Sequence, residues 1–304
     1  MTEDYPRTLL ELEKHFSDEA ECRAYLFTLR WPQGFICPAC GAAGLVIRRD
    51  LWRCVQCGRE TSVLAGTIFQ DSKLPLSIWF RAIWQMTSQK NGVSALGLQR
   101  VLGLGNYRTA WMLLHKLRRA MVRPGRDRLN GVVEVDEAYW GAAESGVRGR
   151  QIIKKALIIV AAQADGNGIG RIRLRHIHDT DRTTLHGFIA QSIDPGSTVV
   201  SDGLQAYREL EGYVHDRQIQ KQQPAGAEHL LPRVHRVISL FKRWLLGTHQ
   251  GAIAHEYLQD YLDEFTFRFN RRKSASRGKL FYRLVQQAVQ VPPVPFHSLP
   301  HHKP

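Results

Sequence analysis

Two aspartates occupy strand-like positions. Asp136 lies between apolar neighbours in VEVDEAYW, where a carboxylate is costly unless it is paired or bound to a cation. Asp202 closes the strand-like segment STVVSDG, where a simple turn at Asp202-Gly203 is the alternative. Two carboxylates on neighbouring strands suit hard divalent cations, which can act on both oxygens of an in-line phosphoryl transfer. Because successive side chains of a strand point to opposite faces, Glu134 lies on the same face as Asp136, whereas Glu137 points to the other face. Glu134 is therefore either a rival metal ligand or a partner of Asp136.

Four of the five cysteines form two C-x2-C pairs, Cys37 with Cys40 and Cys54 with Cys57, each followed by a glycine. Such a turn brings two thiolates to one ion, the glycine permits a positive φ angle, and two turns complete a tetrahedral zinc site. Because all four ligands are protein side chains, we expect this zinc to be structural. Two disulfides are the alternative, which a cytosolic chain disfavours. Cys22 lies outside the pattern and is predicted to be a buried helix residue.

A strand-rich segment from residue 131 onward must position the two aspartates. Residues 131–141 alternate apolar and polar side chains, and residues 156–162 form a continuous apolar run suited to a central strand. Asp165-Gly166-Asn167-Gly168 is a hairpin signal, followed by a second alternating strand, a helical stretch and STVVSDG. Three hairpin-connected strands, a helix, a fourth strand and further helices are the order of an RNase H-like α/β domain.

The region before this sheet is predicted to be helical. Two helical patterns, VSALGLQRVLGL and GNYRTAWMLLHKLRRAM, meet at Gly103-Leu104-Gly105, as in a helix-turn-helix. Ordinary core packing of two helices is the alternative. Residues 81–130 contain ten Lys and Arg against one acid, a net charge of +9, which favours a DNA-binding role.

The composition narrows the class of protein. The chain has 304 residues, 43% of them hydrophobic, which excludes disordered, collagen-like and disulfide-scaffold proteins. A net charge of +14 implies a polyanionic partner, either nucleic acid or a membrane surface. The longest apolar run is far shorter than the roughly 20 residues of a spanning helix, and the first residues are acidic rather than signal-like. We therefore expect a cytoplasmic, nucleoid-associated protein with no membrane partner.

Together these motifs resemble those of bacterial insertion-sequence transposases with an amino-terminal zinc ribbon and a DDE-type, RNase H-like catalytic domain. The resemblance spans nearly the whole chain, through CPACG…CVQCG with TSVLAGTIFQDSKLPLSIWFRAIW, VEVDEAYWG, VVSDGLQAY, LPRVHRVISLFKRWLLGTHQG and YLDEFTFRFNRR. It implies DNA cleavage and strand transfer at the ends of a mobile element. It also implies catalytic Mg2+ or Mn2+ on Asp136 and Asp202, in addition to the structural Zn2+.

The third catalytic position departs from the plain pattern of that group. A typical member has Glu or Asn on the helix after the second aspartate, a few turns before a Lys. Here a helix is predicted over residues 232–246, Lys242 matches the Lys, and His235 lies two turns upstream on the same face. The resemblance therefore assigns the third position to His235, as a ligand better suited to Mn2+ than to Mg2+ or as a proton acceptor. The alternatives are Glu228, Glu264, or a plain helix histidine facing DNA.

The predicted DNA contacts are basic side chains before and after the sheet. Residues 271–304 carry seven Lys and Arg and no acid, whereas residues 131–230 have a net charge of −2, from 11 bases and 13 acids. We assign DNA binding to the basic segments 81–130 and 271–304, and catalysis to the slightly acidic segment 131–230 between them. The predicted contacts, besides a phosphate contact by Lys242, are Arg108, Lys116, Arg118, Arg119, Arg243, Arg271, Arg272 and Lys273.

These patterns predict a multidomain α+β chain. The predicted parts are a helical segment (1–30), a zinc ribbon (31–72), a helix-turn-helix-like region (73–128), an RNase H-like catalytic domain (129–290) and a disordered tail (291–304). Because two element ends must be brought together, a homodimer or higher oligomer on double-stranded element-end and target DNA is expected. Two other classes remain open: an inactive DNA-binding regulator derived from a transposase, and a structure-specific RNase H-like nuclease.

Overall fold

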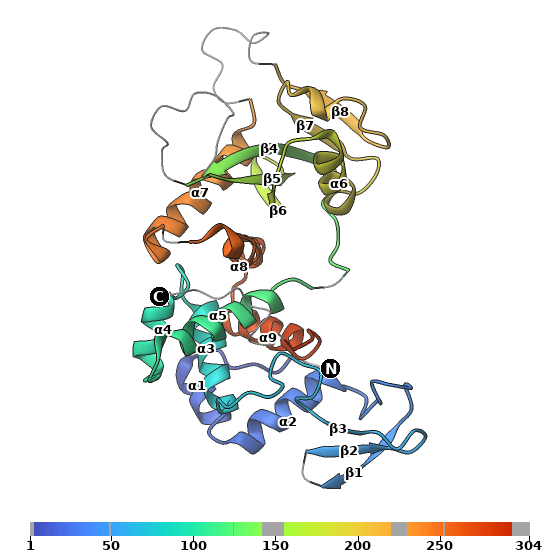
Figure 1. Ribbon diagram of the computed structural model, residues 1–304, viewed down its shortest axis with the longest axis vertical. Coiled ribbons are helices and arrows are strands. Elements are labelled where there is room, and N and C mark those ends of the chain that lie inside the picture. The colour runs from blue at the N-terminus through green and yellow to red at the C-terminus, as the bar shows by residue number, and fades with distance from the viewer. Residues whose placement is uncertain are drawn as a thin grey trace. The chain divides into compact units, whose positions relative to one another are not determined.

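The chain forms two compact units, Met1–Arg123 with Lys273–Pro304, and Pro124–Arg272. The computed structural model (Figure 1) describes residues 3–48, 50–123, 125–141, 155–219, 230–251 and 253–293. Glu228 and most of the predicted tail, residues 294–304, lie outside these ranges. Within them, no helix combines the length and the apolar character needed to cross a membrane.

The first unit begins with two helices and a small antiparallel sheet. Helices α1 (Leu9–His15) and α2 (Glu19–Arg30) precede strands β1 (Gly44–Arg48), β2 (Leu51–Cys54) and β3 (Glu60–Ser62), which pair in the order β1-β2-β3. Strands β1 and β2 are joined by a tight turn, in which Asp50 has a φ angle of 65°. The third strand, ETS, is too short to show alternation in the sequence.

The remaining helices of this unit surround an aromatic core. They are α3 (Leu76–Ser88), α4 (Ala95–Leu102), α5 (Tyr107–Ala120) and α9 (Arg277–Ala288). Phe80 of α3 lies with its ring centroid 4.7 Å from that of Phe16 and 5.7 Å from that of Phe281 on α9. This differs from the predicted catalytic domain 129–290, because the apolar face of α9, with Leu280 and Leu284, is buried within the first unit.

The second unit is built on a five-stranded mixed sheet (Figure 1). Its strands are β4 (Val132–Trp140), β5 (Ala156–Asp165), β6 (Gly168–Ile177), β7 (Thr198–Ser201) and β8 (Val214–Arg217). They lie in the order β6-β5-β4-β7-β8, with β5 antiparallel to β4 and β6, and β7 parallel to β4 and β8. Along the chain, these elements follow the predicted RNase H-like order of three strands, a helix and a fourth strand, to which the structure adds β8, a short polar edge strand.

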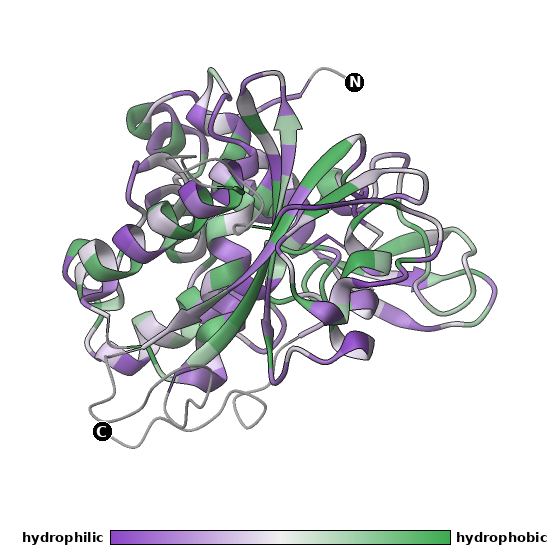
Figure 2. Ribbon diagram, turned by 90° about the horizontal axis from the view of Figure 1, so that it is seen from above, coloured by the Kyte–Doolittle hydropathy of each residue, from purple (hydrophilic) through white to green (hydrophobic). Residues whose placement is uncertain are grey.

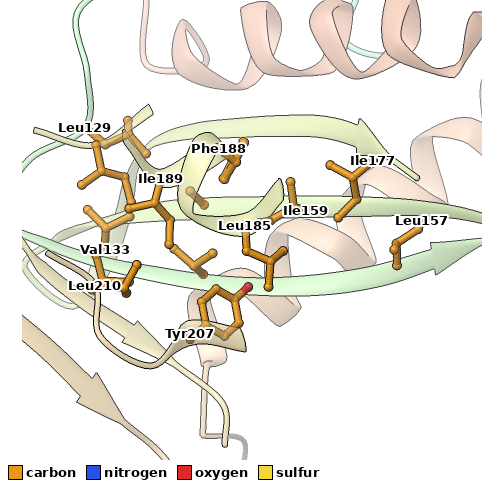
Figure 3. Close-up of a cluster of buried hydrophobic side chains, with 14 residues drawn as sticks. Leu129, Val133, Leu157, Ile159, Ile177, Leu185, Phe188, Ile189, Tyr207 and Leu210 are labelled. Atoms are coloured by element: carbon orange, nitrogen blue, oxygen red, sulfur yellow. The ribbon is translucent and has the colours of Figure 1, made fainter. Parts of the chain in front are cut away.

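Helices cover both faces of this sheet. Helix α6 (Arg182–Ser192) packs Leu185, Phe188 and Ile189 onto one face, together with Val133 of β4 (Figure 3). Each such fully buried apolar side chain contributes about 1.5–3 kcal/mol relative to exposure. Hydrophobic stretches along the strands appear green in Figure 2, and β5 is buried from Ala156 to Ala162.

Helix α7 (Pro232–His249) contacts β4 and β5, and α8 (Leu258–Asn270) contacts β6. Short 3-10 turns, η1 (Gln205–Tyr207) and η3 (His255–Tyr257), precede β8 and α8. The Asn270 side chain accepts a hydrogen bond from the Ile172 N–H (2.7 Å) and donates one to the Ile172 carbonyl (3.1 Å). Helix α8 thereby provides hydrogen-bond partners for backbone groups on the outer edge of strand β6, which would otherwise be able to pair with another chain.

Candidate metal centres and nucleic-acid interface

The four predicted zinc ligands converge in the first unit. The sulfurs of Cys37, Cys40, Cys54 and Cys57 all lie within 4.8 Å of one another. The Cys37–Cys57 and Cys40–Cys54 sulfur distances are 3.6 and 3.4 Å. Four thiolates bound tetrahedrally at about 2.3 Å from one zinc ion lie roughly 3.8 Å apart, so this donor set fits zinc. The cysteines form no disulfide, and the separations are far too long for one.

Backbone N–H groups in the turn of the second C-x2-C pair favour the thiolate form of Cys54. The Cys54 sulfur receives the N–H groups of Gln56 (3.4 Å) and Cys57 (3.5 Å), and the Cys57 contact is the largest cause that lowers the pKa of Cys54 to about 6. Gly41 and Gly58, which follow the pairs, have φ angles of 76° and 68°, as predicted. A ligand set made of four protein sulfurs indicates a structural metal.

Strand register brings the two aspartates together in the second unit. The parallel pairing of β4 with β7 ends with Glu134 opposite Val200, and Asp136 and Asp202 each follow two residues later. Asp202 directly follows β7, and its Oδ1 accepts the Leu204 N–H at 2.9 Å in a tight turn. The β4 strand and the end of β7 thus present both carboxylates at one place.

His235 on α7 completes this group. Its Nε2 lies 3.1 Å from Oδ2 of Asp136. Burial is the largest cause that raises the pKa of Asp136, and the charge of Asp202 raises it further, whereas the Glu137 N–H and His235 lower it. Asp136 thus has a second carboxylate and an imidazole in its surroundings, which are groups that can hold a divalent cation.

One pair of these donors, Asp136 and His235, has the spacing of two ligands of a divalent cation. Two donors bound at about 2.1 Å to one octahedral ion, at right angles, lie about 3 Å apart, close to the distance between Asp136 and His235. Within the described ranges, only the four cysteines gather three or more potential ligand atoms inside 4.8 Å. The set of Asp136, Asp202 and His235 is therefore looser than the zinc set, and its three side chains would have to move closer to bind one ion together.

The two glutamates beside Asp136 have structural partners. Glu134 is 4% exposed and binds Arg233, while Glu137 accepts a hydrogen bond from the buried Tyr207 hydroxyl on the α6 side of the sheet. The sequence placed these two side chains on opposite faces, which is confirmed. Glu264, the other rival carboxylate in the described chain, is fully buried in α8 and forms an ion pair with Arg268.

The side chains predicted to contact DNA differ in how exposed they are to solvent. Arg108, Arg243 and Lys273 are exposed, and Lys116, Arg119, Lys242 and Arg271 are half-buried. Arg118 is 1% exposed among the core side chains of α5, which contradicts a surface contact with DNA. The periodicity could have shown this, because Arg118 lies four residues after the buried Leu114.

Arg272 is held by the protein itself. Its guanidinium donates to the carbonyls of Gly170 (3.1 Å), Phe269 (2.9 Å) and Ile169, and lies 3.9 Å from the centre of the Phe269 ring. These bonds tie the end of α8 to the β5–β6 hairpin. The predicted DNA grip by Arg272 is therefore corrected to a structural role.

Two family models match two separate parts of the chain. Residues 17–60 match the transposase zinc-ribbon domain, and residues 128–270 match the ISXO2-like transposase domain. A curated relative from Halobacterium salinarum, described as an uncharacterized protein in transposable element ISH50, is 26% identical over 282 residues. That match covers 84% of this chain and 92% of the relative.

Two solved structures show weaker likeness. The catalytic core domain of BIV integrase is 15% identical, covering 49% of this chain and 89% of that chain with a TM-score of 0.32. A simian T-cell lymphotropic virus intasome in complex with PP2A regulatory subunit B56 gamma is 14% identical, covering 69% and 77% with a TM-score of 0.30. At such low TM-scores these likenesses add nothing to the fold described above.

A four-cysteine ribbon followed by a mixed sheet with paired aspartates defines a zinc-ribbon protein with a transposase domain. The chain matches a transposase zinc-ribbon domain and an ISXO2-like transposase domain and is similar to a protein of a transposable element, which confirms the resemblance seen in its motifs.

Proposed function

We propose that this protein binds the ends of an insertion sequence and catalyses divalent-metal-dependent phosphodiester hydrolysis and strand transfer. The observation that carries the proposal is the convergence of Asp136 and Asp202 from paired strands, with the His235 imidazole 3.1 Å from Asp136. Oxygen donors of this kind suit Mg2+ or Mn2+. Family membership supports the substrate class, DNA.

Asp136 and Asp202 would hold Mg2+ or Mn2+, which would supply Lewis-acid activation of the phosphodiester. His235 would either add a nitrogen ligand or accept a proton from the attacking water. Hydrolysis then leaves a 3′-hydroxyl at the element end. That hydroxyl attacks a target phosphodiester at the same site, one P–O bond forming as another breaks, so no covalent enzyme intermediate is needed.

DNA is held by basic side chains of both units. Helices α4 and α5, joined by a four-residue turn with Gly103 at a φ angle of 62°, act as the helix-turn-helix that contacts element-end DNA. The half-buried Lys242 and the exposed Arg243 bind phosphates near the site. Two copies of the chain hold the two ends.

Cleavage of a duplex carrying the element end, with Mg2+ or Mn2+, tests this proposal. We expect wild-type protein to nick the end, and Asp136→Asn and Asp202→Asn to retain DNA binding but lose cleavage. Glu211→Gln, which removes an exposed acid outside the site, serves as the matched control and should cleave normally. End binding without cleavage by the wild type would indicate a regulator, and a preference for branched DNA would indicate a structure-specific nuclease.

A further inference from the structure

Helix α7 begins without a capping side chain of its own. Its N-cap residue is Leu231, which offers no side-chain acceptor, and Pro232 follows. The first N–H groups of a helix have no partner within the helix, and burying them without an acceptor is costly. The helix that carries His235 therefore depends on an acceptor from elsewhere in the unit.

Glu134 of β4 supplies that acceptor. Its Oε2 accepts the backbone N–H groups of Arg233 (2.7 Å) and Val234 (3.0 Å). The next N–H, that of His235, donates to the Leu231 carbonyl at 3.1 Å, and Pro232 has no N–H to satisfy. All N–H groups of the first turn are thus accounted for, and a carboxylate faces the positive end of the helix dipole.

The same carboxylate is also neutralised and anchored. Oε1 of Glu134 accepts Nη1 of Arg233 at 2.8 Å. The other guanidinium nitrogens of Arg233 donate to the carbonyls of Gly168 (3.1 Å) and Gly166 (3.0 Å), in the turn between β5 and β6. With both oxygens occupied and only 4% of its surface exposed, Glu134 is closed to a catalytic cation.

This arrangement fixes the register between the helix and the strand. Glu134 binds the two residues immediately before His235, and Asp136 lies two residues after Glu134 on the same face of β4. Because each helical residue turns by about 100°, a slip of one residue in α7 would swing the imidazole away from Asp136. A misplacement of about 1 Å can slow a positioned reaction by roughly a hundredfold.

We propose that Glu134 is a positioning residue: it caps α7 and holds His235 in register with Asp136, without binding the cation or the DNA. This inference rests on the proposed function of the aspartate site. It explains why a buried acid stands two residues before Asp136, where an uncompensated charge would destabilise the sheet.

A double-mutant cycle between Glu134→Gln and His235→Ala tests the proposal by single-turnover cleavage of element-end DNA. Glu134→Gln should slow cleavage about tenfold to a hundredfold with unchanged DNA affinity, as for other residues that orient a metal ligand. In the His235→Ala background the same change should cost about threefold or less. Asp18→Ala, which removes the carboxylate cap of α2 (2.8 Å to the Glu21 N–H), is the control for losing a cap and should cleave as wild type.

A spectroscopic measurement gives a second readout besides activity. Where wild-type protein shows nitrogen coupling to bound Mn2+ in pulsed electron paramagnetic resonance, that coupling should weaken in Glu134→Gln and vanish in His235→Ala. If His235 acts as a base, the wild type shows no coupling and the kinetic cycle alone decides.

Equal slowing by Glu134→Gln with and without His235, or wild-type cleavage by Glu134→Gln, would overturn the positioning role alone. If the wild-type protein itself neither cleaves DNA nor binds Mn2+, the proposed function fails and this inference fails with it.

Discussion

The zinc ribbon and the aspartate site hold their potential metal ligands in opposite ways. In the ribbon, four identical donors from two short turns lie within 4.8 Å of one another, and no position is left for another ligand. In the second unit, the donors come from β4, from the end of β7 and from α7, and His235 is 99 residues from Asp136. The comparison teaches that a site built from two short turns assembles locally, whereas a site built from two strands and a helix needs the fold of the whole unit to assemble it.

The largest effect is expected from breaking the closed site. Cys54→Ser should release the zinc and unfold β1–β3, because structural zinc contributes about 10–16 kcal/mol to small zinc domains. Zinc content by atomic absorption and limited proteolysis of the ribbon measure the outcome. Cys22→Ala, at the buried cysteine of α2 outside the cluster, should keep its zinc. A Cys54→Ser protein with full zinc would contradict the four-cysteine site.

Altering the open site should change chemistry while leaving the fold intact. His235→Ala should slow cleavage of element-end DNA by about 10–100-fold, as the loss of a ligand or a general base does. His235→Glu should recover cleavage with Mg2+ more than with Mn2+, because Mg2+ prefers oxygen donors. Rates measured in both metals check this. If His235→Ala cleaves as fast as wild type, the third position belongs to another residue.

A matched pair of glycine substitutions distinguishes the two units by stability. A Cβ atom at Gly278 of α9 would lie 1.7 Å from the Pro6 carbonyl oxygen, whereas one at Gly187 of α6 would meet no atom within 4 Å. Gly278→Ala should therefore destabilise the first unit by about 1–3 kcal/mol. Gly187→Ala should stabilise the second unit by up to about 1 kcal/mol. Thermal unfolding measures both, and an unaffected Gly278→Ala protein would contradict the close packing of α9 against the amino-terminal segment.

The smallest expected effect distinguishes an arginine that binds DNA from an arginine that stabilises the fold. Arg243 is exposed, so Arg243→Ala should leave stability unchanged and reduce the salt dependence of DNA binding by about one unit of slope. Arg272→Ala should leave that slope unchanged but destabilise the second unit, because three carbonyls lose their donor. Binding titrations at several salt concentrations and urea unfolding measure the pair. Reversed results would restore Arg272 as a DNA contact.

The sequence predicted the zinc site almost completely, because C-x2-C spacing and the following glycines encode its geometry locally. It also predicted the first four strands of the second unit, β4 to β7, and their order along the chain. These predictions came from the alternation of apolar and polar residues and from a strong hairpin signal. Strand β8 was missed because VHDR is short and polar, and α9 was placed with the sheet because chain order does not reveal which core a helix joins.

The aspartate site was only partly predictable. Asp136 and Asp202 stood out as acids at strand positions, but the pairing of β4 with β7 is a long-range contact that spacing alone does not encode. The role of Glu134 was left open between rival ligand and partner. Two signals pointed to its partner: a buried acid in need of compensation, and a helix that begins with Leu231-Pro232 and lacks a cap of its own.

Binding of Mn2+ to the wild-type chain and to Asp202→Asn, measured together with zinc content, tests the central claim most directly. We predict that the wild type binds Mn2+ in addition to its zinc, and that Asp202→Asn retains the zinc but binds Mn2+ at least about tenfold more weakly, since one carboxylate ligand is lost. Equal Mn2+ affinity in both proteins would show that the catalytic cation is held elsewhere.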